Sequence, residues 1–193
     1  MCRAKGTIAK ALTAYLVVSA LCISPVTLAA SLPSSLRQTL ADTYQQQQTP
    51  QQQWLARQWR QRMDTPLAAF IPDPDKRRAL LTQVHQEAQL AGLPPDVVLA
   101  LIHVESAFDA DAVSSAGAVG LMQIMPFWME ELGLPTDDLS DPTRNLRYGC
   151  TILAHYLAME QGDFTRALAR YNGSLGDTWY PERVMHAWRD HWR

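Results

Sequence analysis

The chain has 193 residues, enough for one domain with a hydrophobic core and an additional segment. Seventeen basic and nineteen acidic residues give a formal net charge of −2, which excludes the strongly basic face of a nucleic-acid-binding protein. Only Lys76 remains as a lysine after the first ten residues, which argues against attachment to a membrane through a polybasic patch.

The first thirty residues have the pattern of an export signal. Three basic residues within the first ten precede an apolar stretch, Ala11 to about Ile23, and small residues follow at Ala29-Ala30. The apolar stretch is too short to span a membrane comfortably. We therefore expect a signal peptide at 1–30 and no integral membrane span after processing. The alternative is an uncleaved membrane anchor.

A glutamine-rich arm is expected next, over residues 31–76. Its runs Gln45–Gln48 and Gln51–Gln53 cannot build a hydrophobic core, so a solvated linker is the simplest interpretation. The alternative is a segment that binds a partner, such as a component of the cell-envelope machinery. From Trp54 to Met63 the large apolar residues have rough helical spacing, which predicts a short amphipathic helix.

From residue 77 to 193 the pattern is helical and strand signals are nearly absent, so we expect an all-α domain. Gly92 and Gly162 end two of the predicted helices, and proline or aspartate begins others. Cys150, the one cysteine left after export, lies in an apolar helical pattern and is expected to be buried. The predicted helices are 77–91, 95 to about 108, 142 to about 161, 166–171 and 183–192.

Glu105 stands near the end of an apolar helical run. It follows Val98 by seven residues and Ile102 by three, spacings that put it on or beside the buried face. Burial and the negative end of the helix dipole would both raise the pKa of its carboxyl. A carboxylic acid that stays protonated near neutral pH is suited to general acid catalysis. A surface glutamate on a helix of different phase is the alternative.

A loop of small residues, Ala110–Gly120, follows this helix and leads to Gln123 in an apolar stretch. Its glycines allow a ligand to approach the backbone, although ordinary turns also explain them. The amide of Gln123 would suit the polar edge of a sugar, or it bonds to the backbone at the edge of the core. Tyr171-Asn172-Gly173 comes where a helix stops, as a helix cap or as part of the same site.

Three stretches taken together resemble a known family. Glu105-Ser106, then Gly117–Pro126, then Ala169–Gly173 are similar in order and spacing to the successive motifs of lytic transglycosylases of the soluble, goose-lysozyme-like type, the SLT domain. The resemblance covers about 85–193 and implies a lysozyme-like helical fold. It also implies a periplasmic enzyme that acts on peptidoglycan glycan strands and leaves 1,6-anhydro-N-acetylmuramic acid ends.

The resemblance also assigns roles by position. Glu105 corresponds to the single catalytic acid and base. Tyr171 corresponds to a tyrosine that hydrogen-bonds this glutamate, and Asn145 to an asparagine that we take as structural. The remaining matched positions are expected to contact substrate: Ser114, at the acetamido group, Gln123, Met125 and Asn172. Two tryptophans, Trp128 and Trp179, either stack on sugar rings or belong to the core.

The sequence departs from the family pattern in two places. Arg170 stands where a small residue is usual before the tyrosine, and Gly176–Pro181 replaces a Glu-Thr-Arg stretch before the last helix. Two other functions remain open: a hydrolase, for which Asp109 and Asp111 are the nearby second carboxylates, and a non-catalytic wall-binding or assembly protein. The five histidines form no ligand-spaced pair, so we expect neither a metal nor a cofactor.

Overall fold

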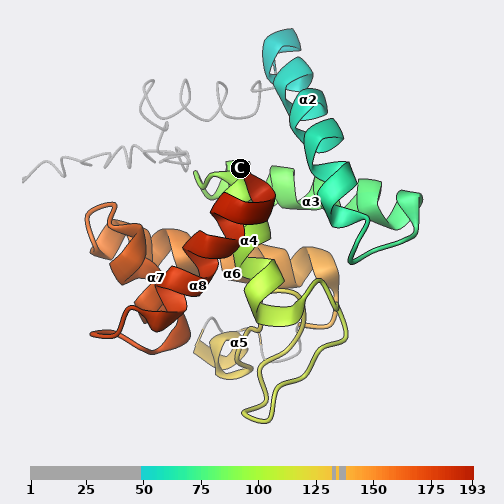
Figure 1. Cartoon of the computed structure of the whole chain (residues 1–193). Helices are drawn as coiled ribbons and strands as arrows, with labels where there is room; N and C mark the ends of the chain where they lie inside the picture. The colour runs from blue at the N-terminus through green and yellow to red at the C-terminus, as the bar shows by residue number, and fades with distance from the viewer. Residues whose placement is uncertain (1–48, 132–133, 135–137) are drawn as a thin grey trace, which may run out of the picture. The chain divides into compact units, whose positions relative to one another are not determined.

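The computed structural model describes residues 49–131, 134 and 138–193. The predicted signal peptide and the first part of the predicted arm lie outside these residues and stay predictions. The described part is helical, with two isolated antiparallel bridges, Val113–Val119 and Val119–Ile124, so the all-α expectation is confirmed there. Its helices (Figure 1) are α2 (Pro50–Leu67), α3 (Pro74–Leu90), α4 (Pro95–Ser106), α5 (Phe127–Glu131), α6 (Pro142–Met159), α7 (Phe164–Asn172), α8 (Trp179–Ala187) and the π-helix η1 (Trp188–Trp192).

Polar side chains fix where four of the eight described helices begin, α2, α3, α6 and α7. Asp73, Asp141 and Asp163 each accept a hydrogen bond from a backbone N–H in the first turn of α3, α6 and α7. Thr49 and Gln52 form a reciprocal capping box at the start of α2. These contacts satisfy N–H groups that have no partner inside the helix, so the chain starts each helix at a defined residue.

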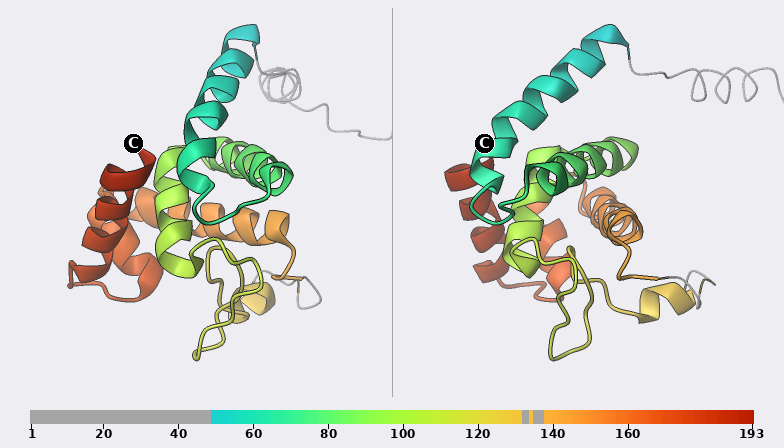
Figure 2. Two further views of the ribbon diagram at one scale, coloured as in Figure 1. Left: turned by 45° about the vertical axis from the view of Figure 1, so that its right-hand side comes forward. Right: turned by 90° about the vertical axis from the view of Figure 1, so that its right-hand side faces the viewer.

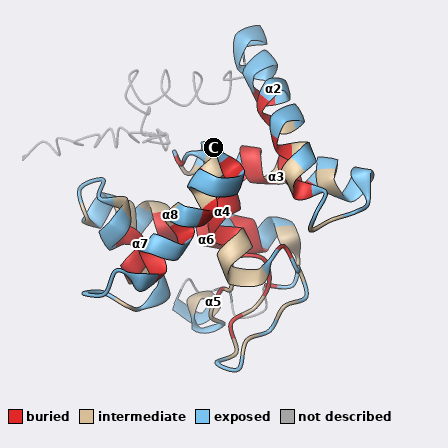
Figure 3. Ribbon diagram, in the orientation of Figure 1, coloured by how far each residue is buried: buried red, intermediate tan, exposed pale blue. Residues whose placement is uncertain are grey.

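Helix α4 forms the centre of the domain. All six residues from Val97 to Ile102 are buried, so the helix is apolar around its circumference. It packs against α3, α8 and η1, while α6 packs against α3 and α7 (Figures 1 and 2). Figure 3 shows that the buried residues concentrate where these helices meet. The carboxyl end of α4, with Glu105, emerges from this core.

Helix α2 belongs to the same compact unit, which begins at Gln48. The sequence placed the start of the domain at residue 77, because a glutamine-rich tract and three prolines precede it. In the structure Trp59, Met63 and Leu67 are buried together with residues of α3 and α4. The predicted amphipathic helix is therefore longer than expected and packs onto the domain, whereas residues 31–48 lie outside the described part.

An irregular segment, 107–126, follows α4 and includes the small-residue loop. It starts with two consecutive non-glycine residues in the left-handed region, Ala107 (φ 50°) and Phe108 (φ 69°). This conformation is uncommon outside glycine and is sustained by surrounding contacts. Phe108 supplies such contacts, since it is buried against Phe70 and Trp192. The chain thus reverses sharply two residues after Glu105.

Candidate active site

Glu105 lies in the last turn of α4 and is partly buried. One of its carboxylate oxygens, Oε1, accepts a hydrogen bond from the hydroxyl of Tyr180 in α8. Burial raises the pKa of Glu105, and the Tyr180 hydrogen bond and the positive charge of Arg183 oppose this to a smaller extent. Of the two alternatives for Glu105, the structure shows the partly buried carboxyl rather than the surface glutamate. Such a carboxyl can release a proton and later take one up.

Tyr180 is itself buried and stays protonated. Its burial and the adjacent charge of Glu105 hold its pKa well above the usual tyrosine value. The hydroxyl therefore acts as a fixed donor to the carboxylate. Tyr180 is not among the residues predicted for the site, because it lies in the stretch where the chain departs from the family pattern. Its one available signal was its position one turn before the buried Val184 of α8.

The hydrogen bond expected between Tyr171 and Glu105 was wrongly assigned. The hydroxyl of Tyr171 donates instead to the backbone carbonyl of Met122, at 2.8 Å. Tyr171 still lies near the glutamate, because the charge of Glu105 contributes to the raised pKa of Tyr171 after the larger effect of burial. Tyr180 occupies the role at Glu105 that the resemblance gave to Tyr171.

Three polar side chains from three helices hold the backbone of residues 119–122. Ser106, at the end of α4, donates to the carbonyl of Leu121 at 2.8 Å. Asn145, in α6, accepts from the N–H of Met122 at 2.8 Å and donates to the carbonyl of Val119 at 2.7 Å. Tyr171 in α7 completes the set at the Met122 carbonyl. Asn145 is buried with its amide fully bonded, which confirms the structural role expected for it.

The side-chain amide of Gln123, which stands in an apolar stretch, is hydrogen-bonded to the backbone of its own loop. Its Nε2 donates to the carbonyls of Ala112 (3.1 Å) and Gly120 (2.9 Å), so both donors bond to the loop's own backbone. Its backbone is left-handed, with φ 49°. These two bonds use the Nε2 donors and leave the Oε1 acceptor of the amide for a ligand. Gln123 therefore shapes the loop whether or not it touches substrate.

The other predicted substrate-binding residues differ in how exposed they are. Ser114 is partly buried, and its Oγ accepts from the N–H of Ala118 at 3.0 Å, which leaves the hydroxyl proton for a ligand. Met125 is partly buried beyond Gln123, and Asn172 is exposed at the end of α7. Their contact with substrate stays a prediction.

The two tryptophans differ in their surroundings. Trp179 is 50% exposed and lies edge-on to Tyr180, with ring centroids 5.7 Å apart. It therefore offers an open aromatic face beside the residue bonded to Glu105. Trp128 is partly buried, packs against the core and stacks on Phe127. Trp179 is the better candidate for stacking on a sugar ring.

Neither nearby aspartate contacts Glu105. Asp109 and Asp111 are both exposed, and Asp109 accepts from the N–H of Asp111 at 3.0 Å within a turn. In the ranges that the structure covers, no group of three or more His, Cys, Asp or Glu is arranged to hold a metal ion. Cys150 is buried, as expected, and its burial raises its pKa to about 12, which makes it a poor nucleophile.

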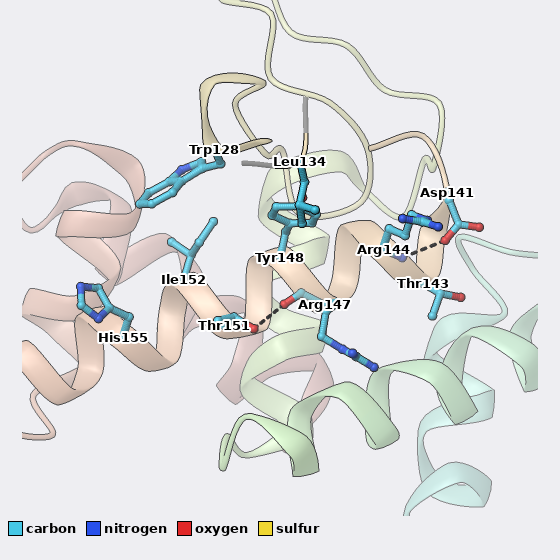
Figure 4. A pocket seen from close by; sticks show the side chains of 10 residues that line it. All are labelled: Trp128, Leu134, Asp141, Thr143, Arg144, Arg147, Tyr148, Thr151, Ile152 and His155. Atoms are coloured by element: carbon cyan, nitrogen blue, oxygen red, sulfur yellow. Dashed lines mark hydrogen bonds between the residues drawn. The ribbon is translucent and has the colours of Figure 1, made fainter. Parts of the chain in front are cut away.

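A hollow of about 880 Å³ runs along α6, and Glu105 is not among the residues that line it (Figure 4). One face of α6, from Thr143 to His155, forms its floor, and Trp128 and Leu134 lie across from it. Arg147, on this floor, pairs with Glu87 of α3, whose side chain is 2% exposed. This ion pair, which is buried on the glutamate side and exposed on the arginine side, was not predicted from the sequence. Of the residues that the sequence singled out for the glycan site, Trp128 lines this hollow, whereas Glu105, Ser114, Gln123, Met125, Tyr171 and Asn172 do not.

Comparison with known proteins decides the family. The family model described as the Transglycosylase SLT domain matches residues 83–186, more than half of the chain. The chain belongs to the SLT domain family. The matched part of this family member includes Glu105 and Tyr180 but leaves out α2 and the first half of α3.

Individual relatives of the SLT chain agree with this assignment. A transglycosylase of Enterobacteria phage PRD1 is 34% identical over 100 residues, which is 48% of this chain and 37% of the relative. A membrane-bound lytic murein transglycosylase C of Klebsiella pneumoniae is 34% identical over 125 residues, 55% of this chain and 35% of the relative. The chain thus spans about a third of the length of these curated relatives.

Two solved structures are also similar to the SLT chain. An inactive mutant of the lytic transglycosylase Slt from Pseudomonas aeruginosa is 32% identical, with a TM-score of 0.44, over 49% of this chain and 17% of the other. A 70-kDa soluble lytic transglycosylase in complex with bulgecin A is 22% identical, with a TM-score of 0.46, over 70% and 23%. No helix in the described ranges is long and apolar enough to span a membrane.

Proposed function

We propose that this protein is a peptidoglycan lytic transglycosylase with Glu105 as its single catalytic acid and base. The observation that carries the proposal is the carboxyl of Glu105, which is partly buried, has a raised pKa and is bonded to Tyr180. Membership in the SLT family and the names of the relatives support the same activity. The substrate is the β-1,4 bond between N-acetylmuramic acid and N-acetylglucosamine.

In the first step Glu105 acts as an acid. Its proton passes to the oxygen that links the two sugars, and the bond from this oxygen to C1 of the muramic residue breaks. The positive charge left at C1 is shared with the carbonyl oxygen of the sugar's own acetamido group. This assistance replaces the second carboxylate of most glycosidases. We assign to the hydroxyl of Ser114 the role of a donor that orients the acetamido group.

In the second step Glu105, now a carboxylate, acts as a base. It removes the proton from the C6 hydroxyl of the same sugar, and the oxygen bonds to C1 to close the 1,6-anhydro ring. The carboxyl is protonated again and no water is consumed. The Tyr180 hydroxyl and the charge of Arg183 stabilise the carboxylate between the two steps, while burial favours the protonated form before and after them.

The remaining parts of the site position the glycan strand. The loop at 119–124 is held by Ser106, Asn145 and Tyr171, so it presents a fixed wall to the sugars. Trp179 offers its exposed face to a sugar ring. The predicted signal peptide at 1–30 would bring the enzyme to the periplasm, where this polymer lies.

Mass spectrometry of the fragments released from purified sacculi tests the proposal. Wild-type protein is expected to release fragments with 1,6-anhydro-muramic ends, and Glu105→Gln is expected to release none. The glutamine keeps the size of the side chain and can still accept from Tyr180, but it cannot transfer a proton. Circular dichroism spectra of both proteins establish that the substitution leaves the fold intact.

The mass spectra of the released fragments also distinguish the other two functions. Fragments with reducing ends would contradict the proposal and indicate a hydrolase. Asp111→Asn would then locate its second carboxylate, whereas a transglycosylase should lose little activity from this change. Release that persists in Glu105→Gln would contradict the role of Glu105. No release by wild-type protein that binds sacculi would indicate a non-catalytic wall-binding protein.

A further inference from the structure

The charges are unevenly distributed along residues 49–193 of the sequence. Residues 49–91, which contain α2 and α3, carry six basic and four acidic residues, a formal net charge of +2. Residues 92–193 carry seven basic and fourteen acidic residues, a formal net charge of −7. The α2–α3 hairpin is thus the basic part of an otherwise acidic domain. An anionic partner would be drawn to the hairpin rather than to the remainder.

A cleft of about 400 Å³ lies between the two helices of this hairpin. Three arginines line it: Arg57 and Arg60 from α2, and Arg78 from α3. Figure 2 shows α2 and α3 joined by a short connection and packed against each other. The spacing of Arg57 and Arg60 puts both on one face of α2, so the three guanidinium groups come from the two sides of one concavity.

The positive charge of the cleft is poorly compensated within the described ranges. Asp64, the acidic residue of its lining, already pairs through both oxygens with Arg77, at 3.0 and 3.2 Å. Neither Arg57 nor Arg60 has a carboxylate partner there. Arg78 pairs with Asp75 at 3.0 Å, but both side chains are largely exposed, so this pair is weak and exchangeable.

The shape of the site and its donors indicate the ligand. Guanidinium groups bind carboxylates through paired hydrogen bonds, and Gln61 adds an amide beside them. A concave cleft between two helices can enclose an extended chain, whereas a flat ligand surface such as a membrane would contact only its rim. All residues that line the cleft lie before residue 83, outside the part that the family model matches (83–186), so the cleft is additional to the SLT domain as such.

We propose that the cleft between α2 and α3 binds the carboxylates of the stem peptides of peptidoglycan, through Arg57, Arg60 and Arg78. This inference rests on the proposed function, because that function brings the protein to a glycan strand whose stem peptides carry several free carboxylates. It adds a peptide-binding element to the glycan site around Glu105. The protein then distinguishes peptide-bearing strands from bare ones.

Binding of two kinds of glycan strand tests this proposal. Labelled strands from sacculi are used with their peptides intact or after an amidase has removed them, and affinities are measured by fluorescence anisotropy. All proteins carry Glu105→Gln, so that strands are not cleaved. Substituting Arg57, Arg60 and Arg78 together with glutamine should lower the ratio of the two affinities about tenfold at low salt. High salt should lower the same ratio for the unsubstituted cleft.

A matched control exists on the same helix. Arg62 is exposed on another face of α2 and does not line the cleft, so Arg62→Gln should leave the affinity ratio unchanged. If the triple variant does not fold, the double variant Arg57→Gln/Arg78→Gln is used instead, because both positions are exposed. The affinity ratio should then fall about three- to fivefold, as expected for the loss of two weak, exposed ion pairs.

Three outcomes would overturn the proposal. The affinity ratio stays the same in the cleft variants, or both affinities fall together, or the variants lose binding to vesicles of anionic lipid while the ratio is unchanged. The last result would assign the cleft to a membrane surface. Failure of the proposed function is measured separately, as absence of anhydro ends when the protein with intact Glu105 acts on peptide-free strands.

Discussion

Glu105 experiences opposing influences on its pKa, and both are useful to a group that must act as acid and then as base. Burial at the end of α4 favours the protonated carboxyl, while the Tyr180 hydroxyl and Arg183 favour the carboxylate. Burial is the largest of the three, so the net pKa is raised above 4.5. The neighbours that make this balance lie about 75 residues further along the chain, in α8.

A raised pKa predicts that Glu105 costs stability at neutral pH. The folded protein holds the proton more tightly than the unfolded chain, so stability falls as pH rises from about 4.5 through the folded pKa. Glu105→Gln removes this loss. We expect the variant to match the wild type near pH 4 and to have the higher Tm at pH 7 to 8, as measured by thermal unfolding across pH.

The contradicting result for this prediction is a Tm difference that does not change with pH, or one that favours the wild type at pH 8. Either would mean that the carboxylate is well solvated or fully paired in the folded state. Ser114→Ala serves as a control, since it removes a hydroxyl from the same region without removing a titrating group.

Tyr180 and Tyr171 provide a matched pair of hydroxyl deletions. Tyr180→Phe removes the donor that lowers the pKa of Glu105, so the loss of activity at high pH should move to higher pH. The rate should fall about 10- to 100-fold, because one hydrogen bond to the carboxylate is lost. Tyr171→Phe should leave the pH profile in place and reduce stability by about 1 kcal/mol, since it frees the carbonyl of Met122.

Activity on sacculi measured from pH 4 to 9 checks this pair, together with urea unfolding of each variant. An unchanged pH profile for Tyr180→Phe would remove Tyr180 from its position at Glu105. A shifted profile for Tyr171→Phe would restore the assignment that the resemblance suggested.

Among the elements, the loop at 119–124 depends on close approach to α6. Gly120 has a φ of +78°, and a Cβ there would overlap the amide of Asn145, which is itself bonded to Val119, Met122 and Leu139. Gly120→Ala therefore combines backbone strain with a steric clash and should cost about 2–4 kcal/mol. A Cβ added at Gly149, inside α6, would overlap the side chain of Met122, without the backbone strain that applies at Gly120.

Gly117 supplies the control for this prediction. It has a similar φ, +86°, but a Cβ there would meet no other atom within 4 Å. Gly117→Ala should cost only the backbone strain, about 1 kcal/mol. Urea denaturation of the two variants measures the difference. Equal losses would contradict the close packing between the loop and α6.

Local sequence signals predicted where the helices begin and end better than they predicted the contacts between helices. Asp141 and Asp163 marked helix starts, and Gly92 and Gly162 marked helix ends, because capping acts within one turn. The last helix begins at Trp179 rather than at Arg183, because Thr178-Trp179-Tyr180-Pro181 reads as a turn until the burial of Tyr180 is known.

The site could be predicted only as far as its residues lie in motifs. Glu105 was singled out by its spacing and by the family motif that it begins. Tyr180 lies in the stretch that departs from the family pattern, and Arg183 was predicted only as the start of the last helix. The hydrogen-bond partners of Gln123 and Tyr171 could not be predicted from the sequence either, since each side chain bonds to a backbone carbonyl that the folded loop brings to it. Periodicity describes one helix at a time, and these contacts join different elements.

At the scale of the whole molecule, α2 extends the domain beyond the part that the family model matches. Its apolar face is buried against α3 and η1, and its exposed side carries glutamines and arginines. The glutamine tract made the whole region resemble a linker, but four buried residues, Ala56, Trp59, Met63 and Leu67, dock α2 onto the domain. Helix α2 is therefore a structural part of the domain, and the cleft it forms with α3 is held in place.

Two substitutions in α2 test this integration. Met63 is 1% exposed in the core, so Met63→Ala should lower the free energy of unfolding by about 2–5 kcal/mol. Leu55 is 52% exposed on the same helix, so Leu55→Ala should change it by less than about 0.5 kcal/mol. Urea unfolding followed by circular dichroism measures both. If Met63→Ala were as mild as Leu55→Ala, α2 would be an appended arm, and the cleft between α2 and α3 would have no fixed geometry with which to bind a peptide.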